Sequence, residues 1–183
     1  KVEPDTTCFA FVGDSTFFAS AITGVVNAVY NQANMVLVVL DNSTTAMTGH
    51  QPHPGTGRTV MGEIVQKINI EQVLRGIGVT EIETINPLEL EASVSCVKRM
   101  AEKSGVRAII FKAPCIAVTK PKAPLHVDQD SCIGCKKCIR DLGCPAIVMN
   151  DGKICIDASM CTGCHLCSQV CPVCAIAGGD DYE

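Results

Sequence analysis

The chain contains no tryptophan, only two tyrosines and five phenylalanines, and 19% of its 183 residues are charged. It has no apolar run of about 18 residues, so the sequence predicts no membrane-spanning helix. No stripe of basic residues is available to meet phosphates, which argues against nucleic acid as a partner. The polar start, residues 1–5, lacks the pattern of a signal peptide. We therefore expect a cytoplasmic protein that binds neither membrane nor nucleic acid.

The net charge is concentrated in the last third of the chain. Up to Pro124 there are 11 basic and 11 acidic residues, and from Leu125 onward there are 4 basic and 8 acidic ones. The formal charge of −4 therefore belongs to the last third alone. An acidic module of this kind is typical of a soluble electron-transfer partner.

Ten of the thirteen cysteines lie between Cys132 and Cys174, where two runs repeat the spacing C-x2-C-x2-C and each is followed by Cys-Pro. This spacing is typical of proteins that bind two [4Fe-4S] clusters, with the fourth cysteine of each run ligating the other run's cluster. The expected ligands of one cluster are Cys132, Cys135, Cys138 and Cys171. Those of the other are Cys161, Cys164, Cys167 and Cys144. The pattern predicts one-electron transfer in a reducing compartment.

Two alternatives and one irregularity accompany this interpretation. Thirteen cysteines can form disulfides, although a secreted framework would spread them more evenly. Zinc sites also use four cysteines, but in C-x2-C pairs instead of triplets. In the first run five residues, not three, separate Cys138 from Cys144. The remaining cysteines are expected to be small buried hydrophobic residues: Cys8, Cys96, Cys115, Cys155 and Cys174.

The first two thirds of the chain alternate between strand and helix patterns. Apolar runs and helical periodicity predict strands at 8–13, 35–40, 79–85 and 106–112, and helices at 16–33, 60–76 and 87–105. This order predicts an α/β fold with an open parallel sheet and helices on both faces. Ser15 or Thr16 is expected to cap the first helix. Asn86 is expected to cap the third helix, with Pro87 in its first turn and Gly105 at its end.

A proline-bearing segment, 119–126, is predicted to link two domains. The first, 1–118, is the open sheet, and the second, 127–183, is a small α+β domain of the bacterial ferredoxin type. Repeated Cys-Pro sequences at 144–147 and 171–176 indicate two pseudo-symmetric halves. The chain has no initiator methionine and reaches a strand within a few residues, so we expect it to be part of a longer protein.

Polar residues follow the first two predicted strands where each one ends. Gly13-Asp14-Ser15 comes after the first strand and Asp41-Asn42 after the second. Neighbouring parallel strands direct their carboxyl ends to one crevice, and the helix that follows Asp14 favours an anion at its start. A carboxylate and an amide oxygen there suit Mg²⁺ bridging a diphosphate. The alternative is that Asp14 only caps the helix.

Gly-Asp-Ser, followed after 25 residues by Asp-Asn, is similar to the thiamine diphosphate motif, in which Gly-Asp-Gly is followed at a like distance by Asn-Asn. The runs 13–18 and 41–55 resemble the alpha subunit of indolepyruvate:ferredoxin oxidoreductase. That family joins a thiamine-binding domain to a C-terminal ferredoxin domain with two clusters, in the order found here. Ser15 departs from the general motif, which has glycine at this third position.

The resemblance implies a role for each matching residue. Asp14 and Asn42 are expected to bind Mg²⁺ through their side chains, and Thr44 through its backbone carbonyl. Gly13 and Ser15 are expected to lie against the diphosphate. The loop expected near the cofactor comprises Thr48, Gly49, His50 and Gln51, of which His50 and Gln51 are the catalytic candidates. His50 and His53 also invite an acid-base role, although imidazoles on such a loop can simply shape and cover the site.

The resemblance further implies oxidative decarboxylation of an arylpyruvate to acyl-CoA and CO2, with the two clusters passing electrons to ferredoxin. The expected partners are a beta subunit, ferredoxin, coenzyme A and the 2-oxo acid. A pyruvate or branched-chain 2-oxoacid oxidoreductase and a non-catalytic electron-transfer subunit are the alternatives. The family's alpha subunit is longer, so we expect a thiamine domain that is incomplete at its N-terminus and a chain that is inactive alone.

Overall fold

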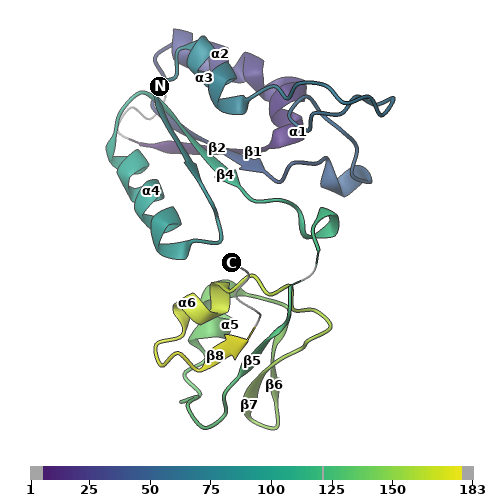
Figure 1. The fold of residues 1–183 in the computed structure, drawn as a ribbon. Coiled ribbons are helices and arrows are strands. Elements are labelled where there is room, and N and C mark those ends of the chain that lie inside the picture. The colour runs from purple at the N-terminus through teal and green to yellow at the C-terminus, as the bar shows by residue number, and fades with distance from the viewer. Residues whose placement is uncertain (1–5, 121, 179–183) are drawn as a thin grey trace. The chain divides into compact units, whose positions relative to one another are not determined.

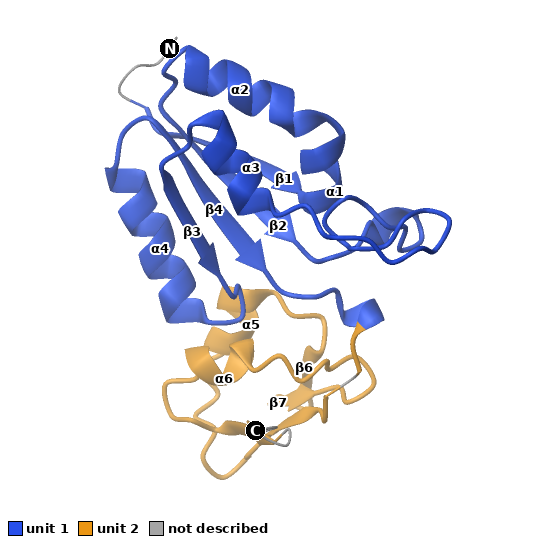
Figure 2. Cartoon of the chain, turned by 45° about the horizontal axis from the view of Figure 1, so that its top comes forward, with its two compact units in different colours: residues 1–118 blue, residues 119–183 orange. Residues whose placement is uncertain are grey.

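The computed structural model describes residues 6–120 and 122–178. The chain divides into two compact units, Lys1–Val118 and Thr119–Glu183 (Figure 2). The predicted fold class is confirmed, because the first unit is an open parallel sheet with helices and the second is a small α+β unit. Among the described residues, none of the helices has the length and apolarity needed to cross a bilayer.

The first unit is built on four parallel strands in the order β1-β2-β4-β3. The strands are β1 (Cys8–Gly13), β2 (Met35–Asp41), β3 (Glu81–Ile85) and β4 (Val106–Lys112). Helices α2 (Ile22–Tyr30) and α3 (Ile70–Ile77) lie on one face of the sheet, and α4 (Leu90–Glu102) lies on the other (Figure 1). The helices on both faces are those that the alternating pattern predicted.

Strand β2 is apolar from Met35 to Leu40 because its central residues are covered on both faces. Leu37 and Val39 belong to the core formed with α2 and α3, which includes the fully buried Leu74. Val36 and Val38 belong to a second core formed with α4. A parallel strand that is buried on both sides has no solvent face, so its sequence does not alternate between polar and apolar residues.

The first helix differs from its prediction at its start. It begins at Asp14 as α1 (Asp14–Thr16), passes through a π-helical turn, η1 (Phe17–Ala21), and continues as α2. Ser15 and Thr16 were therefore wrong as caps, because both lie inside the helix. Asp14 itself accepts the Ser15 N–H through Oδ1 at 2.7 Å, which satisfies one donor of the first turn.

The helix predicted at 60–76 is wrong over its first half, since α3 begins only at Ile70. Gly57 and Gly62 before it adopt left-handed φ angles of 77° and 92°, which a helix does not accommodate. The helix starts instead at Asn69, whose side chain accepts an N–H of the first turn at 3.0 Å.

Helix α4 is shorter than predicted at both ends. Asn86 Oδ1 accepts the N–H of Leu88 at 3.0 Å, so it caps a turn before the helix and not the helix itself. The helix begins after Glu89 and has ended before Gly105, whose φ of 84° forms the bend into β4. Pro87 therefore lies in the preceding turn, outside the first helical turn.

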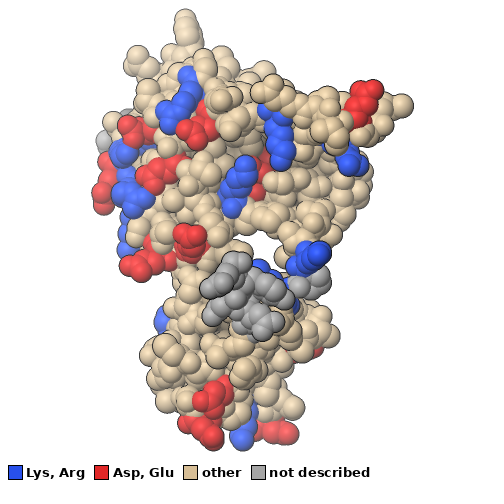
Figure 3. Space-filling model, viewed as in Figure 1, with Lys and Arg blue, Asp and Glu red and all other residues tan. Residues whose placement is uncertain are grey.

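Ion pairs join α4 to the neighbouring strand β3. Arg99 Nη2 lies 2.5 Å from Glu83 Oε2, and Lys103 pairs with Glu81. The hydrogen bond from Arg99 lowers the pKa of the Glu83 carboxyl. On the face shown in Figure 3, basic and acidic side chains alternate over the described surface of the first unit, without a basic stripe.

The second unit contains two antiparallel strand pairs and two short helices. Its elements are β5 (Leu125–Val127) paired with β8 (Ile176–Gly178), β6 (Ile147–Asn150) paired with β7 (Lys153–Ile156), α5 (Lys137–Leu142) and α6 (Leu166–Val170). Strand β5 begins inside the segment 119–126 that was predicted as a linker. Asp151 and Gly152 join β6 to β7 with positive φ angles of 46° and 78°, as a two-residue hairpin turn requires.

Candidate functional site

The two cysteine loops of the second unit follow the same backbone path. Gly134 and Gly163, at equivalent positions, both have a φ of 66°, and Lys136 and His165 both have a φ of 60°. Left-handed angles are uncommon for residues other than glycine, so their repetition shows that both loops wind in the same way. Each loop then enters a short helix, α5 or α6. The backbone therefore has the pseudo-symmetry that the repeated Cys-Pro sequences predicted.

An aspartate stands at the entrance of each loop, a feature that the sequence analysis missed. The carbonyl oxygens of Asp128 and Asp157 each accept the N–H of the first cysteine of their loop, at 3.0 Å in both cases. Hydrogen bonds from the hydroxyls of Ser131 and Ser159 lower the pKa values of the two carboxyls. The recurring Asp-x3-Cys spacing was the signal that could have found them.

The four cysteines predicted to hold one cluster line a single cavity. The lining thiols are Cys132, Cys135, Cys138 and Cys171. The remaining wall is mainly apolar and includes Val127, Ile133, Ile154, Val173 and Ile176. The backbone N–H of Ala175 donates to Cys171 Sγ at 3.3 Å. An N–H aimed at sulfur stabilises a thiolate, and such bonds tune the potential of a bound cluster.

The four cysteines predicted to hold the other cluster also lie near one another. The pKa of Cys167 is raised to about 11, mainly by burial and in smaller part by the charges of Cys164, Cys161 and Cys144. The N–H of Leu125 donates to Cys161 Sγ at 3.4 Å. Thiols with a raised pKa are protonated at neutral pH, and iron that binds them must displace their protons.

The longer spacing in the first run is taken up by local structure. Helix α5 has six residues, whereas α6 has five. Gly143 follows α5 with a left-handed φ of 57° and returns the chain to Cys144. The irregular spacing therefore places Cys144 beside the second set of thiols without disturbing the first loop.

The cysteines outside these two sets differ in burial. Cys96 is buried, as predicted, and Cys115 and Cys155 are partly buried. The prediction is wrong for Cys8 and Cys174, which are exposed, the first on edge strand β1 and the second in a turn with a φ of 51°. In the part of the chain that the structure describes, no three His, Cys, Asp or Glu side chains lie in positions from which they could hold one metal ion together.

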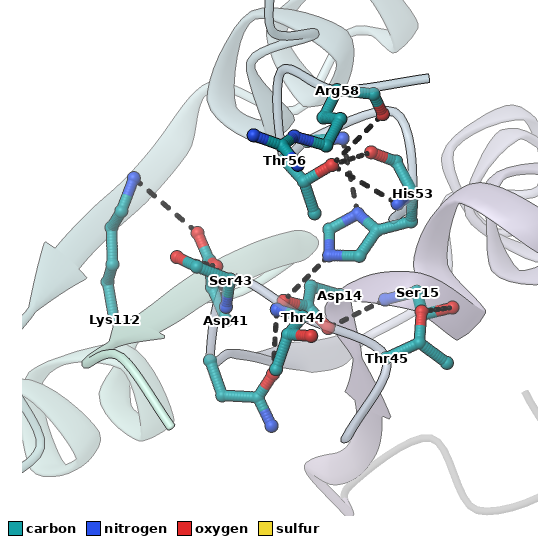
Figure 4. Close-up of polar contacts among 12 residues, drawn as sticks. Asp14, Ser15, Asp41, Ser43, Thr44, Thr45, His53, Thr56, Arg58 and Lys112 are labelled. Carbon is teal, nitrogen blue, oxygen red and sulfur yellow. Dashed lines mark hydrogen bonds and ion pairs between the residues drawn. The ribbon is translucent and has the colours of Figure 1, made fainter. Parts of the chain in front are cut away.

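The second candidate site lies where β1 meets α1. Asp14 is 3% exposed, and its Oδ2 atom lies 3.1 Å from His53 Nε2 (Figure 4). The two atoms are not aligned as a hydrogen bond, and neither has a hydrogen-bond partner among the described residues. A buried carboxylate oxygen without such a partner carries a large desolvation cost. The position therefore favours a cation.

The loop after β2 brings two further predicted residues to this place. Asn42 Oδ1 accepts the N–H of Thr44 at 3.1 Å, and Asp41 Oδ1 accepts the N–H of Ser43 at 3.0 Å. These bonds fold the loop tightly, and Ser43 adopts a left-handed φ of 61°. Thr44 is 6% exposed and lies beside Asp14 in Figure 4.

Side-chain bonds tie this loop to its neighbours. Thr45 Oγ1 donates to Ser15 Oγ at 3.0 Å, which joins the two strand-end segments. Asp41 Oδ2 lies 3.5 Å from Lys112 Nζ at the end of β4, and the Asp41 carbonyl accepts the Ala113 N–H at 3.1 Å. The ends of β1, β2 and β4 are thus held together by polar contacts.

The loop with the catalytic candidates lies farther out. Thr48 donates to Gln51 Oε1 at 2.6 Å, and Gly49 follows the short helix η2 (Ala46–Thr48) with a φ of 109°. His50 and Gln51 are both exposed on this loop. The histidine that reaches the buried carboxylate is His53, which the sequence analysis had named only together with His50, as a candidate for an acid-base role.

A cleft of about 310 Å³ opens outside the carboxyl ends of β2, β3 and β4. Asp41, His53, Lys67, Thr84 and Lys112 contribute to its lining. Doubly wound sheets bind their ligands in this position. Glu71 also lines the cleft, so its two lysines are matched by two carboxylates and the formal charges balance.

The residues present fit a magnesium–diphosphate group. The unsatisfied Asp14 Oδ2, a second lone pair on Asn42 Oδ1 and the Thr44 carbonyl are hard oxygen donors, which Mg²⁺ prefers. A Cβ built on Gly13 would meet no atom within 4 Å, so space is open beside the backbone there. The remaining Mg²⁺ ligands would come from phosphate and water.

Comparison with known families defines the class of this chain. Residues 1–111 match the thiamine pyrophosphate enzymes, C-terminal TPP binding domain, and residues 125–172 match the 4Fe-4S dicluster domain. The chain therefore belongs to the thiamine pyrophosphate (TPP) enzymes and carries a dicluster domain after its TPP-binding domain.

Curated relatives narrow the similarity to one subunit. The chain is 46% identical over 169 residues to the indolepyruvate oxidoreductase subunit IorA of Methanothermobacter thermautotrophicus, covering 91% of this chain and 27% of that protein. It is 40% identical over 173 residues to the IorA subunit of Archaeoglobus fulgidus, covering 91% and 28%. It is thus an IorA homologue that spans about 27% of the length of the first of these relatives.

A solved structure shares the fold. The 2-oxoglutarate:ferredoxin oxidoreductase from Magnetococcus marinus superposes with a TM-score of 0.54 at 18% identity, over 59% of this chain and 39% of that chain. At this identity the similarity establishes the fold of the matched part only.

Proposed function

We propose that this chain is the cofactor-binding and electron-relay part of an oxidoreductase that oxidatively decarboxylates arylpyruvates, 2-oxo acids of the indolepyruvate type. The observation that carries the proposal is the combination, in one chain, of a buried carboxylate at the strand ends of a TPP-binding domain and two sets of four cysteines in a dicluster domain. Relatives named as subunits of indolepyruvate oxidoreductase support the choice of substrate. The proposed location is the cytoplasm.

The proposed reaction converts a 2-oxo acid, coenzyme A and two oxidised ferredoxins into acyl-CoA, CO2, a proton and two reduced ferredoxins. Thiamine diphosphate, when bound, supplies the nucleophilic carbon and the electron sink for decarboxylation. A beta subunit and ferredoxin are the proposed partners. The two cysteine sets would hold two [4Fe-4S] clusters, which would supply one-electron transfer.

The residues of the first unit bind and orient the cofactor in this proposal. Asp14 and Asn42 hold Mg²⁺ through side-chain oxygens, and Thr44 holds it through its carbonyl. Gly13 and Ser15 lie against the diphosphate, and Thr48 and Gly49 belong to the loop beside the cofactor. His50 and Gln51 remain the candidates for contact with the substrate.

The test uses the full-length protein, purified without oxygen together with its partner subunit. We expect Asp14→Ala to abolish Mg²⁺-dependent binding of thiamine diphosphate in calorimetry, along with 2-oxo acid turnover. The electron paramagnetic resonance signals of the reduced clusters should persist, because the variant leaves all cluster cysteines intact. Glu102→Ala, an exposed carboxylate at the end of α4, is the matched control and should change neither property.

Substrate profiling of the intact complex completes the test. Faster ferredoxin reduction with indolepyruvate than with pyruvate or branched-chain 2-oxo acids is the expected result. A wild-type protein with both clusters but no affinity for thiamine diphosphate would instead be a non-catalytic electron-transfer subunit.

A further inference from the structure

The contact between Asp14 and His53 differs from the other described ion pairs in its burial. The two side chains are only 4% and 5% exposed, whereas every other described pair has a partner that is at least 46% exposed. Surface pairs contribute little, but a buried carboxylate depends strongly on its few neighbours. His53 is therefore placed to control the orientation of the Asp14 carboxylate.

The hydrogen bond at the other ring nitrogen defines the tautomer of His53. The N–H of Gly55 donates to His53 Nδ1 at 3.2 Å, so Nδ1 must carry a lone pair. In the neutral imidazole the proton is then on Nε2, which faces Asp14. The ring therefore presents a donor to the carboxylate, which can only accept.

Packing holds the ring in this position. His53 stacks on Phe18 with ring centroids 5.8 Å apart and an interplanar angle of 29°. Thr56 Oγ1 donates to the His53 carbonyl at 2.8 Å and fixes the backbone of the loop. A Cβ on Gly55 would lie 3.0 Å from His53 Cε1, so the ring fills the space above that glycine. The imidazole has little freedom to turn away from Asp14.

Asp14 is consequently held from both ends. Ser15 N–H donates to Oδ1 at 2.7 Å, and His53 Nε2 lies 3.1 Å from Oδ2. A carboxylate has about four lone-pair sites, so two such contacts leave sites free on the same group for a metal ion. The hydrogen bond from Ser15 holds one carboxylate oxygen, and the close approach of His53 to the other limits how far the carboxylate can rotate.

We propose that His53 is a positioning residue of the magnesium site: its Nε2–H orients the Asp14 carboxylate for Mg²⁺ without touching the substrate. This inference rests on the proposed function, in which Asp14 ligates Mg²⁺. Partners that orient a metal ligand typically contribute 10–100-fold to metal affinity. We therefore expect about that loss when the donor is removed and the ring's shape is kept.

The experiment measures Mg²⁺ affinity by calorimetry in the full-length complex, with thiamine diphosphate in excess. His53→Phe keeps a ring against Phe18 but has no donor, and we expect Mg²⁺ binding about 10–100-fold weaker. His53→Gln places an amide N–H near the position of Nε2 and should restore most of the affinity. A purely structural role for His53 predicts that both variants lower the melting temperature and leave Mg²⁺ affinity unchanged.

A variant at Gly55 tests the position of the His53 ring without changing any polar side chain. Gly55→Ala would place its methyl group 3.0 Å from both the His53 and the Phe18 rings, so the stacked rings must shift and His53 is displaced from Asp14. We expect weaker Mg²⁺ binding, in the same direction as for His53→Phe. Gly76→Ala on α3, where a Cβ meets no atom within 4 Å, is the matched control and should bind Mg²⁺ like the wild type. Gly55→Ala keeps the inference testable if His53→Phe fails to fold.

The outcomes separate this inference from the proposed function. If the wild-type complex binds no Mg²⁺ with thiamine diphosphate, the proposed function fails and this inference fails with it. If the wild type binds Mg²⁺ and both His53→Phe and Gly55→Ala bind it as tightly as the wild type does, only the positioning role is overturned. Weak binding by His53→Phe with recovery by His53→Gln supports both.

Discussion

The two units of this chain are stabilised in different ways. In the first unit, β2 supplies apolar side chains to a core on each face of the sheet, against α2 and α3 on one side and α4 on the other. In the second unit the strands have three or four residues, the helices have five or six, and cysteines line the interior cavity. So small a unit buries little apolar surface and typically needs a metal group to remain folded.

This contrast also separates two kinds of information in the sequence. The fold of the first unit is encoded in apolar periodicity, which many residue combinations satisfy. The fold of the second is encoded in the spacing of the cysteines, because in a 4Fe-4S dicluster domain each set of four sulfur atoms must reach one cluster. The first unit should therefore tolerate loss of iron, and the second should tolerate loss of a sheet contact in the first.

The largest expected effect follows from removal of iron. Chelation without oxygen should unfold the second unit and leave the first folded, because only the second depends on cluster ligation. Hydrogen exchange of the full-length protein provides the measurement. Amides of β6 and β7 should lose protection, while those of β2 keep it. Protected β6 and β7 amides in the iron-free protein would show that the second unit has a sufficient core of its own.

A substitution that leaves a cavity in the core of the first unit should have the opposite effect: it should destabilise the first unit and leave the second unchanged. Leu74 of α3 is fully buried in the core that α2 and α3 form with the sheet, so Leu74→Ala should lower that unit's free energy of unfolding by about 2–5 kcal/mol. The cluster signals in electron paramagnetic resonance should be unchanged. Val26→Ala on α2, at a side chain that is 48% exposed, is the control and should stay within about 0.5 kcal/mol. Loss of cluster signal in Leu74→Ala would mean that the units are not independent.

A smaller effect distinguishes the two cysteine loops themselves. Gly134→Ala should cost about 1–2 kcal/mol, because its left-handed φ is strained for alanine but its Cβ meets no atom within 4 Å. Gly163→Ala should cost more, because its Cβ would also lie 2.7 Å from the Ala123 carbonyl oxygen. Denaturant midpoints for cluster release from the intact protein measure the difference. Equal midpoints would indicate that the backbone at Ala123 can move away from the added methyl group without a loss of stability.

The strands of the first unit were predictable because their patterns are local. The apolar run at 35–40 lies in β2 and the run at 106–112 is β4. The helix starts were predicted less accurately than the strands. Asn86 has a side chain suited to a cap and an adjacent proline, yet it caps the turn that precedes α4.

The candidate site was predictable in the same uneven manner. Asp14 and Asn42 follow strand ends, so the order of the elements was sufficient to expect them at one edge of the sheet. The role of His53 depends on a loop that folds back over α1 and places imidazole beside carboxylate. No periodicity in the sequence indicates such a contact, because Asp14 begins helix α1 and His53 lies in a separate segment of irregular backbone.

By itself, the sequence determined which chemical groups this protein has and the order in which they follow one another: a carboxylate after one strand, an amide after the next, and two sets of spaced thiols. These features are local, and bonding geometry restricts each of them to few arrangements. Only the tertiary structure decided which side chain lies against the buried Asp14 and which of the two histidines nearby reaches it. That choice depends on the path of a loop, and the free energy that fixes such a path comes from packing against Phe18 and hydrogen bonds to Gly55 and Thr56.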